Sequence, residues 1–327
     1  MNVRFRTFLL LCILSGCSRG AVIQPPFLER GDRVAIVAPS YRLDDSLLTR
    51  ACEELRSAGL VPVLGEHVSD AWPQGPDSTF FYAGTPSQRA SDLGMALRDT
   101  SIKAIICARG GYGAIRTLQL MNLSDFRSHP KWIVGYSDVT ALHLASLKAG
   151  VMSLHGNMGG EIGRVGLGEK GNAAMLEVLM GKMPRYCFPS SEFNVQGRAE
   201  GILLGGNMIT LVSLLGTAYD SLGDRDCILF LEEVEESMHA IDRLLCMLQM
   251  QGKLSNVKGL VFGEFSDCSA ELPFGSVEQM LSDYTMNLGI PVCYGFPGGH
   301  GELNMPLVEG AATVLDVTMD EVSLRQL

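Results

Sequence analysis

Short apolar runs alternate with segments of helical periodicity through the first half of the chain. Residues 33–38 form an apolar run that ends in Pro39-Ser40, and apolar side chains then recur at helical spacing over residues 47–57. Further strands are predicted at residues 60–64, 104–107, 132–134 and 152–155, and a further helix at residues 87–98. Repeated βα units of this length predict a parallel sheet covered by helices, with any active site at the carboxyl ends of the strands.

The pattern changes in the second half. Glycines are frequent over residues 156–198, and only residues 173–180 keep a helical spacing, so this stretch is interpreted as an inter-domain linker. Beyond it, strands are predicted at residues 201–204, 227–231 and 260–262, helices at 208–215 and 235–251, and a hairpin at 311–316 and 321–324. The predicted fold is α/β: an N-terminal parallel-sheet domain (27–155), a C-terminal mixed α/β domain (199–327), and an active site between them.

The first residues have the features of an export signal. Arg4 and Arg6 precede an apolar run over residues 8–14, which is too short to span a bilayer and ends in Leu14-Ser15-Gly16-Cys17. This ending resembles the lipobox of bacterial lipoproteins, in which cleavage before the cysteine is followed by lipidation of its thiol. We therefore expect a signal peptide over residues 1–16, a lipidated Cys17 and a tether over residues 17–26.

That leader also predicts a location. A lipidated protein would be held at the membrane in the cell envelope, facing the periplasm. The alternative is a cytoplasmic protein with a hydrophobic N-terminus.

Composition narrows the classes of partner and of site. The 327 residues carry a formal charge of −10 without a basic cluster, which argues against nucleic acid and against anionic lipid as partners. Membrane contact is thus expected only through the lipid anchor. The nine cysteines contain no C-x-x-C pair, and no group of His, Cys and Asp has metal-ligand spacing. Buried thiols are predicted rather than a disulfide framework, with no metal and no cofactor.

The strongest candidate for chemistry is the stretch over residues 131–143. Its apolar strand breaks at Gly135-Tyr136-Ser137-Asp138 into a helical pattern, so Ser137 lies at a sharp bend between strand and helix. Such a bend exposes a serine hydroxyl beside the amides of a helix N-terminus, where an oxyanion can be held. The match to the G-x-S-x-G elbow is partial, because Val139 replaces the second glycine. The alternative is an N-cap serine.

A glycine-rich turn follows the strand at residues 104–107. Three of the four residues at 110–113 are glycines, which lets the backbone approach a ligand closely and exposes its amides. The spacing fits neither nucleotide-binding glycine pattern, so a phosphate cradle is rejected. Amides of Gly110 and Gly111 suit an oxyanion hole beside Ser137, with Arg109 available for a substrate carboxylate. The alternative is a tight turn without a ligand.

Two further polar residues occupy positions that favour function. Glu232 follows the buried strand at residues 227–231, whose rigid backbone would hold its carboxylate. Glu233, Glu235 and Glu236 are interpreted as a solvated first helical turn, favoured by the helix dipole. His300 lies between glycines, in a loop rather than on an apolar helix face.

Seven motifs together resemble one known family. They are Gly31-Asp32-Arg33-Val34-Ala35-Ile36-Val37-Ala38-Pro39-Ser40, Tyr82-Ala83-Gly84-Thr85 with Arg89, Ala108-Arg109-Gly110-Gly111-Tyr112-Gly113, Gly135-Tyr136-Ser137-Asp138, Gly205-Gly206-Asn207, Leu231-Glu232-Glu233 with Ile241-Asp242-Arg243, and Gly299-His300-Gly301 with Asn304. In this order they resemble the LD-carboxypeptidases, or muramoyltetrapeptide carboxypeptidases. These are serine peptidases, and the family includes the microcin-immunity peptidases.

The resemblance implies roles for three residues. Ser137 is then the nucleophile, His300 the general base, and Glu232 the acid that orients the imidazole. The oxyanion would be met by the amide of Asp138 and by one from Gly110 or Gly111. The implied substrate is the murein tetrapeptide or a related muropeptide, cut at the L,D amide bond that releases terminal D-alanine. The family is usually homodimeric, and its best-known members are cytoplasmic.

Other functions stay open at this point. Immunity-type members of the same family use the three residues on a different amide. A non-catalytic muropeptide-binding lipoprotein is possible, although binding alone would not require Ser137, Glu232 and His300 together. An α/β-hydrolase esterase would need a complete G-x-S-x-G, which Val139 does not allow.

Overall fold

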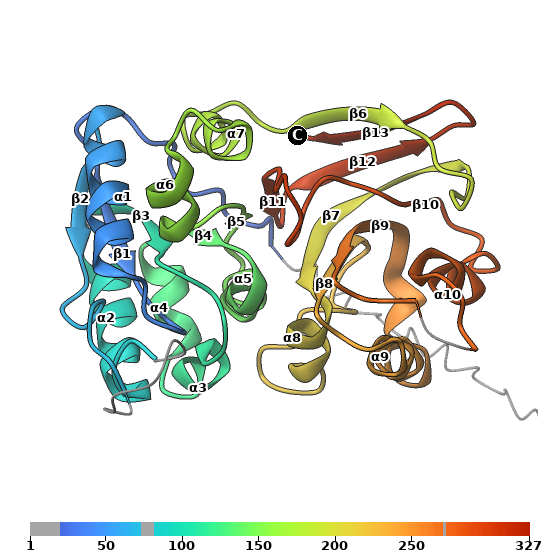
Figure 1. The fold of residues 1–327 in the computed structure, drawn as a ribbon, viewed down its shortest axis with the longest axis horizontal. Helices are drawn as coiled ribbons and strands as arrows, with labels where there is room; N and C mark the ends of the chain where they lie inside the picture. Colours follow the sequence, from blue (N-terminus) through green and yellow to red (C-terminus); the bar gives the residue numbers. More distant parts are fainter. Residues whose placement is uncertain (1–19, 73–81, 271–272) are drawn as a thin grey trace, which may run out of the picture.

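The structure is a computed structural model that describes residues 20–72, 82–270 and 273–327. It contains two β-sheets, one built mainly from the N-terminal half of the chain and one from the C-terminal half, and these lie side by side (Figure 1). The predicted signal peptide and Cys17 lie outside the described residues.

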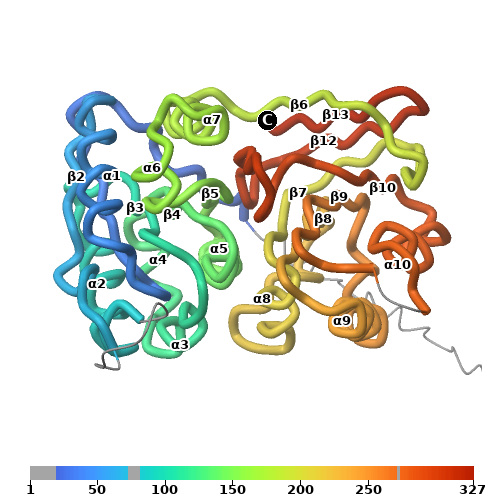
Figure 2. Tube along the Cα trace, viewed as in Figure 1, coloured from blue at the N-terminus to red at the C-terminus, as the bar shows by residue number. Residues whose placement is uncertain are grey.

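The first sheet has six strands in the order β11-β5-β4-β3-β1-β2. They are β1 (Arg33–Val37), β2 (Val61–Leu64), β3 (Ile102–Cys107), β4 (Trp132–Gly135), β5 (Ser153–His155) and β11 (Leu307–Glu309). The first five are parallel, as predicted, whereas β11 pairs antiparallel with β5. Strand β11 comes from the C-terminal half of the chain and so closes the edge of the N-terminal sheet (Figure 2).

Helices cover both faces of this sheet. They are α1 (Asp45–Ser57), α2 (Pro86–Arg98), α3 (Ala114–Leu118), α4 (Leu123–Ser128), α5 (Thr140–Lys148), α6 (Gly159–Val165) and α7 (Lys170–Leu179). Side chains of β1 alternate between two cores: Val34 and Ile36 pack with α1, whereas Ala35 and Val37 pack with α2. Burial on both faces explains why the strands read as continuous apolar runs.

The second sheet has seven strands in the order β10-β9-β8-β7-β12-β13-β6. They are β6 (Arg185–Pro189), β7 (Gly197–Asn207), β8 (Cys227–Val234), β9 (Val257–Ser266), β10 (Val292–Cys293), β12 (Ala312–Val317) and β13 (Glu321–Gln326). Strands β7 to β10 are parallel, and β12, β13 and β6 add antiparallel pairs. The helices of this half are α8 (Met208–Ser213), α9 (Met238–Met250), α10 (Val277–Thr285) and the short η2 (Lys253–Asn256).

The two halves share a hydrophobic core. Leu142 of α5 and Leu211 of α8 belong to one continuous cluster of buried residues, and the two helices pack against each other. The stretch over residues 156–198, expected to be a linker, is itself structured. Its helix α6 packs on α1, and its strand β6 forms the edge of the second sheet. Among the described residues, no helix is long and apolar enough to cross a membrane.

Candidate active site

Ser137 lies at a strained bend immediately after β4. Its backbone φ is +63°, in the left-handed region that residues with a Cβ rarely occupy, and the short helix η1 (Ser137–Val139) then leads into α5. No capping hydrogen bond from its hydroxyl is formed at either helix start. Strain without a cap bond is typical of an exposed nucleophile and does not suit an N-cap serine.

The glycine-rich turn after β3 lies directly against this serine. A Cβ placed on Gly110 would come within 3.1 Å of Ser137 Oγ, so a larger residue here would crowd the hydroxyl. The backbone N–H groups of Gly110 and Gly111 donate to no other group in the described part of the chain. Two free amides beside a serine hydroxyl form a ready anion-binding position.

The Asp138 side chain holds this turn in place. Its Oδ2 accepts hydrogen bonds from Ser40 Oγ at 2.5 Å and from the Ala114 backbone N–H at 2.8 Å, and the carboxyl is buried. The loops after β1, β3 and β4 are therefore tied to one carboxylate. A hydrogen bond to a charged acceptor is stronger than a neutral one, so the amides of Gly110 and Gly111 are firmly positioned.

Arg109 projects from the same turn. Its guanidinium lies over the Tyr41 ring, 5.8 Å from the ring centroid, and forms no ion pair with the described residues. The side chain is only partly buried. A cation without an acidic partner at this position is available for a carboxylate ligand.

Glu232 and His300 form a hydrogen-bonded pair in the C-terminal half. The Nδ1–H of His300 donates to Glu232 Oε2 at 2.6 Å, because a carboxylate can only accept. The Glu232 side chain is fully buried, whereas that of His300 is 16% exposed. In the neutral imidazole, this arrangement leaves His300 Nε2 without a proton and able to accept one.

The surroundings set the pKa of His300. Burial lowers this pKa, but the hydrogen bond and the charge of Glu232, together with the charges of Glu233 and Glu161, outweigh it. The pKa of His300 is therefore raised above its ordinary value of 6.5. A histidine paired in this way is a stronger base than a free one.

Glycine lets the His300 loop approach this carboxylate. Gly299 has a φ of +122°, and a Cβ on it would come within 2.8 Å of Glu232 Oε2. The loop is also held by the Glu264 backbone N–H, which donates to Gly298 O at 3.0 Å. Any larger residue at position 299 would push the loop away from Glu232.

Tyr136 brings the two halves of the site together. This residue directly precedes Ser137, and its ring packs against the His300 ring with centroids 4.9 Å apart. Its hydroxyl donates to Glu161 Oε1 at 3.3 Å. Ser137, which follows β4 of the first sheet, and His300, which bonds to Glu232 on β8 of the second sheet, are thus gathered at one place where the halves meet.

The environment of Glu233 differs from the one predicted. It was expected on a solvated helical turn, but its side chain is buried and accepts hydrogen bonds from Asn207 Nδ2, at 2.7 Å, and from the Ile209 backbone N–H, at 2.8 Å. Strand β8 runs to Val234, three residues further than predicted, so Glu233 lies inside the strand. Its burial raises the pKa of this carboxyl to about 7.

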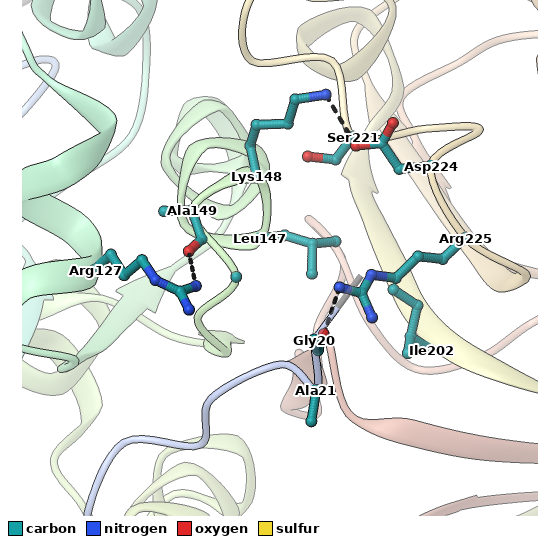
Figure 3. Close-up of a pocket in the computed structure, with 11 residues that line it drawn as sticks. Gly20, Ala21, Arg127, Leu147, Lys148, Ala149, Ile202, Ser221, Asp224 and Arg225 are labelled. Atoms are coloured by element: carbon teal, nitrogen blue, oxygen red, sulfur yellow. Dashed lines mark hydrogen bonds and ion pairs between the residues drawn. The ribbon is translucent and has the colours of Figure 1, made fainter. Parts of the chain in front are cut away.

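Helix α5 is fastened to the C-terminal half along its length. The Asn207 backbone N–H donates to Thr140 Oγ1 at 2.9 Å near the start of the helix. At its end, Lys148 pairs with Asp224 at 2.9 Å on the rim of a cavity of about 360 Å³ between the halves (Figure 3). None of the predicted site residues lines this cavity. It therefore marks the junction of the halves and is separate from the site around Ser137.

The described cysteines carry free thiols, and five of the seven are buried. No group of three or more His, Cys, Asp or Glu side chains in the described ranges is arranged to hold a metal ion.

Known proteins share both halves of this architecture. A family model of the LD-carboxypeptidase N-terminal domain matches residues 34–156, and a model of the LD-carboxypeptidase C-terminal domain matches residues 200–315. Together they cover more than half of the chain. The chain belongs to the LD-carboxypeptidase family. The resemblance read from the seven motifs is therefore confirmed.

Relatives in this family align over nearly the whole chain. A Bacillus subtilis protein named "Probable murein peptide carboxypeptidase" is 33% identical over 300 residues, which cover 90% of this chain and 91% of that protein. A solved muramoyltetrapeptide carboxypeptidase from Oxalobacter formigenes is 28% identical, with a TM-score of 0.77 over 89% of this chain and 97% of the other. The predicted two-part α/β fold is confirmed by this LD-carboxypeptidase structure.

The microcin C7 self-immunity protein MccF has the same fold. It superposes with a TM-score of 0.79 over 93% of this chain and 99% of its own, at 20% identity. At 20% identity, this similarity shows a shared fold and nothing more.

Several residues of the site escaped the sequence analysis. Ser40, Tyr136, Asn207 and Asn304 all lie inside the quoted motifs, which was the available signal, but nothing in the sequence told which contact each makes. His155 was noted only as the end of a strand. Two of its neighbours in space, Asn304 and Phe230, come from the other half of the chain.

Proposed function

We propose that this protein is a serine-type LD-carboxypeptidase that cleaves the L,D amide bond of murein tetrapeptide and releases terminal D-alanine. One observation carries the proposal. The His300 ring, hydrogen-bonded through Nδ1 to buried Glu232, packs against the residue that precedes a strained Ser137. A histidine oriented by a buried carboxylate and lying near a serine at a strained bend supports acyl-transfer chemistry.

The reaction would proceed in two stages. His300 Nε2 takes the proton of Ser137 as Oγ bonds to the carbonyl carbon, and Glu232 stabilises the imidazolium that results. The tetrahedral oxyanion receives hydrogen bonds from the amides of Asp138 and of Gly110 or Gly111, each typically worth about 3 kcal/mol. The C–N bond then breaks, and D-alanine leaves with the proton from His300. Water, deprotonated by the same histidine, hydrolyses the acyl-enzyme and frees Ser137.

The names of the relatives support the substrate. The Bacillus subtilis and Oxalobacter formigenes proteins are named for murein peptide and muramoyltetrapeptide, respectively. Arg109 would bind the carboxylate of the terminal D-alanine, because it has no acidic partner of its own among the described residues.

Assembly and location belong to the same proposal. A lipid on Cys17 would tether the enzyme to the membrane, within the cell envelope and facing the periplasm, where murein lies. We also propose a homodimer, as the family resemblance implies.

The proposal is tested by incubating purified protein with murein tetrapeptide and following D-alanine by mass spectrometry. The wild type is expected to release D-alanine, and Ser137→Ala to lose several orders of magnitude in rate while staying folded. Ser128→Ala is the matched control, because its hydroxyl donates to Ser124 O at the exposed end of α4. Turnover near wild type in Ser137→Ala would refute the nucleophile assignment. No release by well-folded wild type would favour an immunity-type amidase, whose fold MccF shares, or a muropeptide-binding protein.

A further inference from the structure

A buried amide, Asn304, lies where the two halves meet, beside the His300 loop. Its side chain is 6% exposed. Its Oδ1 accepts a hydrogen bond from the backbone N–H of Gly299, the residue before His300, at 3.0 Å. The same oxygen bonds to Nε2 of His155 at 3.1 Å, and His155 pairs in the sheet with Gly135, two residues before Ser137. One oxygen thus links the loop of the base to the strand of the nucleophile.

The polarity of these hydrogen bonds is fixed by the groups beyond them. Asn304 Nδ2 donates to Asn157 Oδ1 at 3.1 Å, and Asn157 Nδ2 donates to Asn172 Oδ1 at 2.8 Å. Asn172 Nδ2 then donates to Gly166 O at 2.7 Å. A carbonyl oxygen can only accept, so every amide along this path has one consistent orientation. Asn304 Oδ1 is therefore an acceptor, and His155 carries its proton on Nε2.

His155 is built to remain in that state. Its ring is fully buried, edge-on to Phe230 at 5.0 Å and to Tyr136 at 6.1 Å between centroids. Burial, aided by the neighbouring His143, lowers the pKa of His155 to about 3. The ring is therefore neutral throughout the physiological pH range, and its Nδ1 has no hydrogen-bond partner among the described residues. Its single ring N–H donates to Asn304 Oδ1.

We propose that Asn304 is a positioning residue which, together with His155, holds the His300 loop in register with Ser137 across the boundary between the halves. This role rests on the proposed function, because it concerns the same base and nucleophile. Without the Asn304 oxygen, the buried Gly299 N–H has no acceptor, and the loop must move to find one. A displacement of about 1 Å in a catalytic group can reduce the rate roughly 100-fold.

Two measurements on the full chain test the role. The first is the kcat and KM of D-alanine release, where Asn304→Ala should lower kcat roughly 100-fold and leave KM within about threefold. The second is an NMR titration of the His300 ring, assigned with a His300→Gln variant. Asn304→Ala should lower the His300 pKa toward 6.5, since the displaced ring loses part of its contact with Glu232.

Matched variants separate positioning from general stability. Gln326→Ala removes another buried amide with comparable hydrogen bonds, to Val308 and Thr313, away from the His300 loop, and should leave kcat and the His300 pKa unchanged. His155→Gln keeps an N–H donor for Asn304, whereas His155→Leu does not. The glutamine variant should retain most of the activity, and the leucine variant should match Asn304→Ala.

The outcomes decide between the two proposals. If wild type releases no D-alanine, the proposed function fails, but the titration still tests the positioning role. If Asn304→Ala resembles Gln326→Ala in both kcat and His300 pKa, the positioning role is overturned. Should Asn304→Ala not fold, the paired His155 variants give the answer, and equal behaviour of His155→Gln and His155→Leu would contradict the proposal.

Discussion

The proposed nucleophile, Ser137, and the proposed base, His300, are held by different means. The Ser137 turn is fixed inside one sheet, where the Asp138 carboxylate ties it to Ser40 and Ala114. The His300 loop depends on both sheets, because Glu232 lies on β8 while Asn304 is held by His155 on β5. The bend at Ser137 is therefore held by local contacts, whereas the loop that carries His300 is held by contacts from both halves.

The energetics of the two regions differ accordingly. Contacts around Ser137 add to the stability of the N-terminal sheet, because they join loops of consecutive strands. Contacts around His300 cross the boundary and add mainly to the precision of the site. Changes to the residues that support the Ser137 turn should therefore lower mainly the free energy of unfolding, and changes to the residues that support the His300 loop should lower mainly activity.

The largest effect is expected for Glu232→Gln, which removes the charge that orients His300. Glutamine nearly keeps the shape of the side chain, but it allows the wrong tautomer of the imidazole. In serine peptidase triads, the equivalent change lowers kcat about 10⁴-fold. The measurement is kcat for D-alanine release, with exposed Glu235→Gln as the matched control. A variant that kept wild-type kcat would show that Glu232 does not orient the base.

The pH dependence of kcat/KM should also depend on the pair of His300 and Glu232, with a smaller effect. The base must be neutral to act, so kcat/KM should fall at acid pH with an apparent pKa above 6.5, because the pKa of His300 is raised. Glu232→Gln removes the principal contribution that raises the pKa and leaves the burial that lowers it, so this limb should move to lower pH. An acid limb below 6.5 in wild type would contradict the assignment.

The raised pKa also has a consequence for stability. A group whose folded pKa exceeds its unfolded value stabilises the fold fully below the unfolded pKa, here about 6.5, and loses that contribution as pH rises through the folded value. Urea unfolding at two pH values, one below 6.5 and one well above neutrality, should show a larger loss of stability in wild type than in Glu232→Gln.

The smallest effect on activity is expected at the elbow. Ser40→Ala removes one hydrogen bond to the buried Asp138 carboxylate and should lower the free energy of unfolding by about 2 kcal/mol. Its kcat should stay within about tenfold of wild type, because the Ala114 N–H still holds the same oxygen. Urea unfolding measures the free energy of unfolding, and D-alanine release measures kcat, with Ser128→Ala as control. A loss of kcat as large as that of Asn304→Ala would remove the contrast between the two regions.

Local patterns predicted the N-terminal half well. The five parallel strands, helices α1, α2 and α5, and the bend at Ser137 follow from short-range periodicity and turn residues, whereas the short helices α3 and α4 were not predicted. The identity of Glu232 and His300 came instead from the family resemblance, since 68 residues separate them along the chain. Periodicity alone could not join them.

The errors have one physical origin. Glu233 was expected in solvent because neighbouring glutamates follow it, yet Asn207 and the start of α8 bury it. Strand β11 was missed because its three residues pair with β5, more than 150 positions earlier. Contacts between distant segments override local sequence preference, and a short segment carries too little pattern to reveal them.

Strand β11 also determines when the N-terminal sheet can be completed during synthesis of the chain. The edge of the N-terminal sheet stays open from the synthesis of β5 until β11 emerges, about 150 residues later. At 5–20 residues per second, this interval lasts roughly 8–30 s. Throughout it, a half-finished sheet exposes an unpaired strand, a template for faulty association. Cutting the chain between residues 156 and 198 would not give two complete units. The N-terminal fragment would lack β11, the edge strand of its sheet, because β11 would remain in the C-terminal fragment.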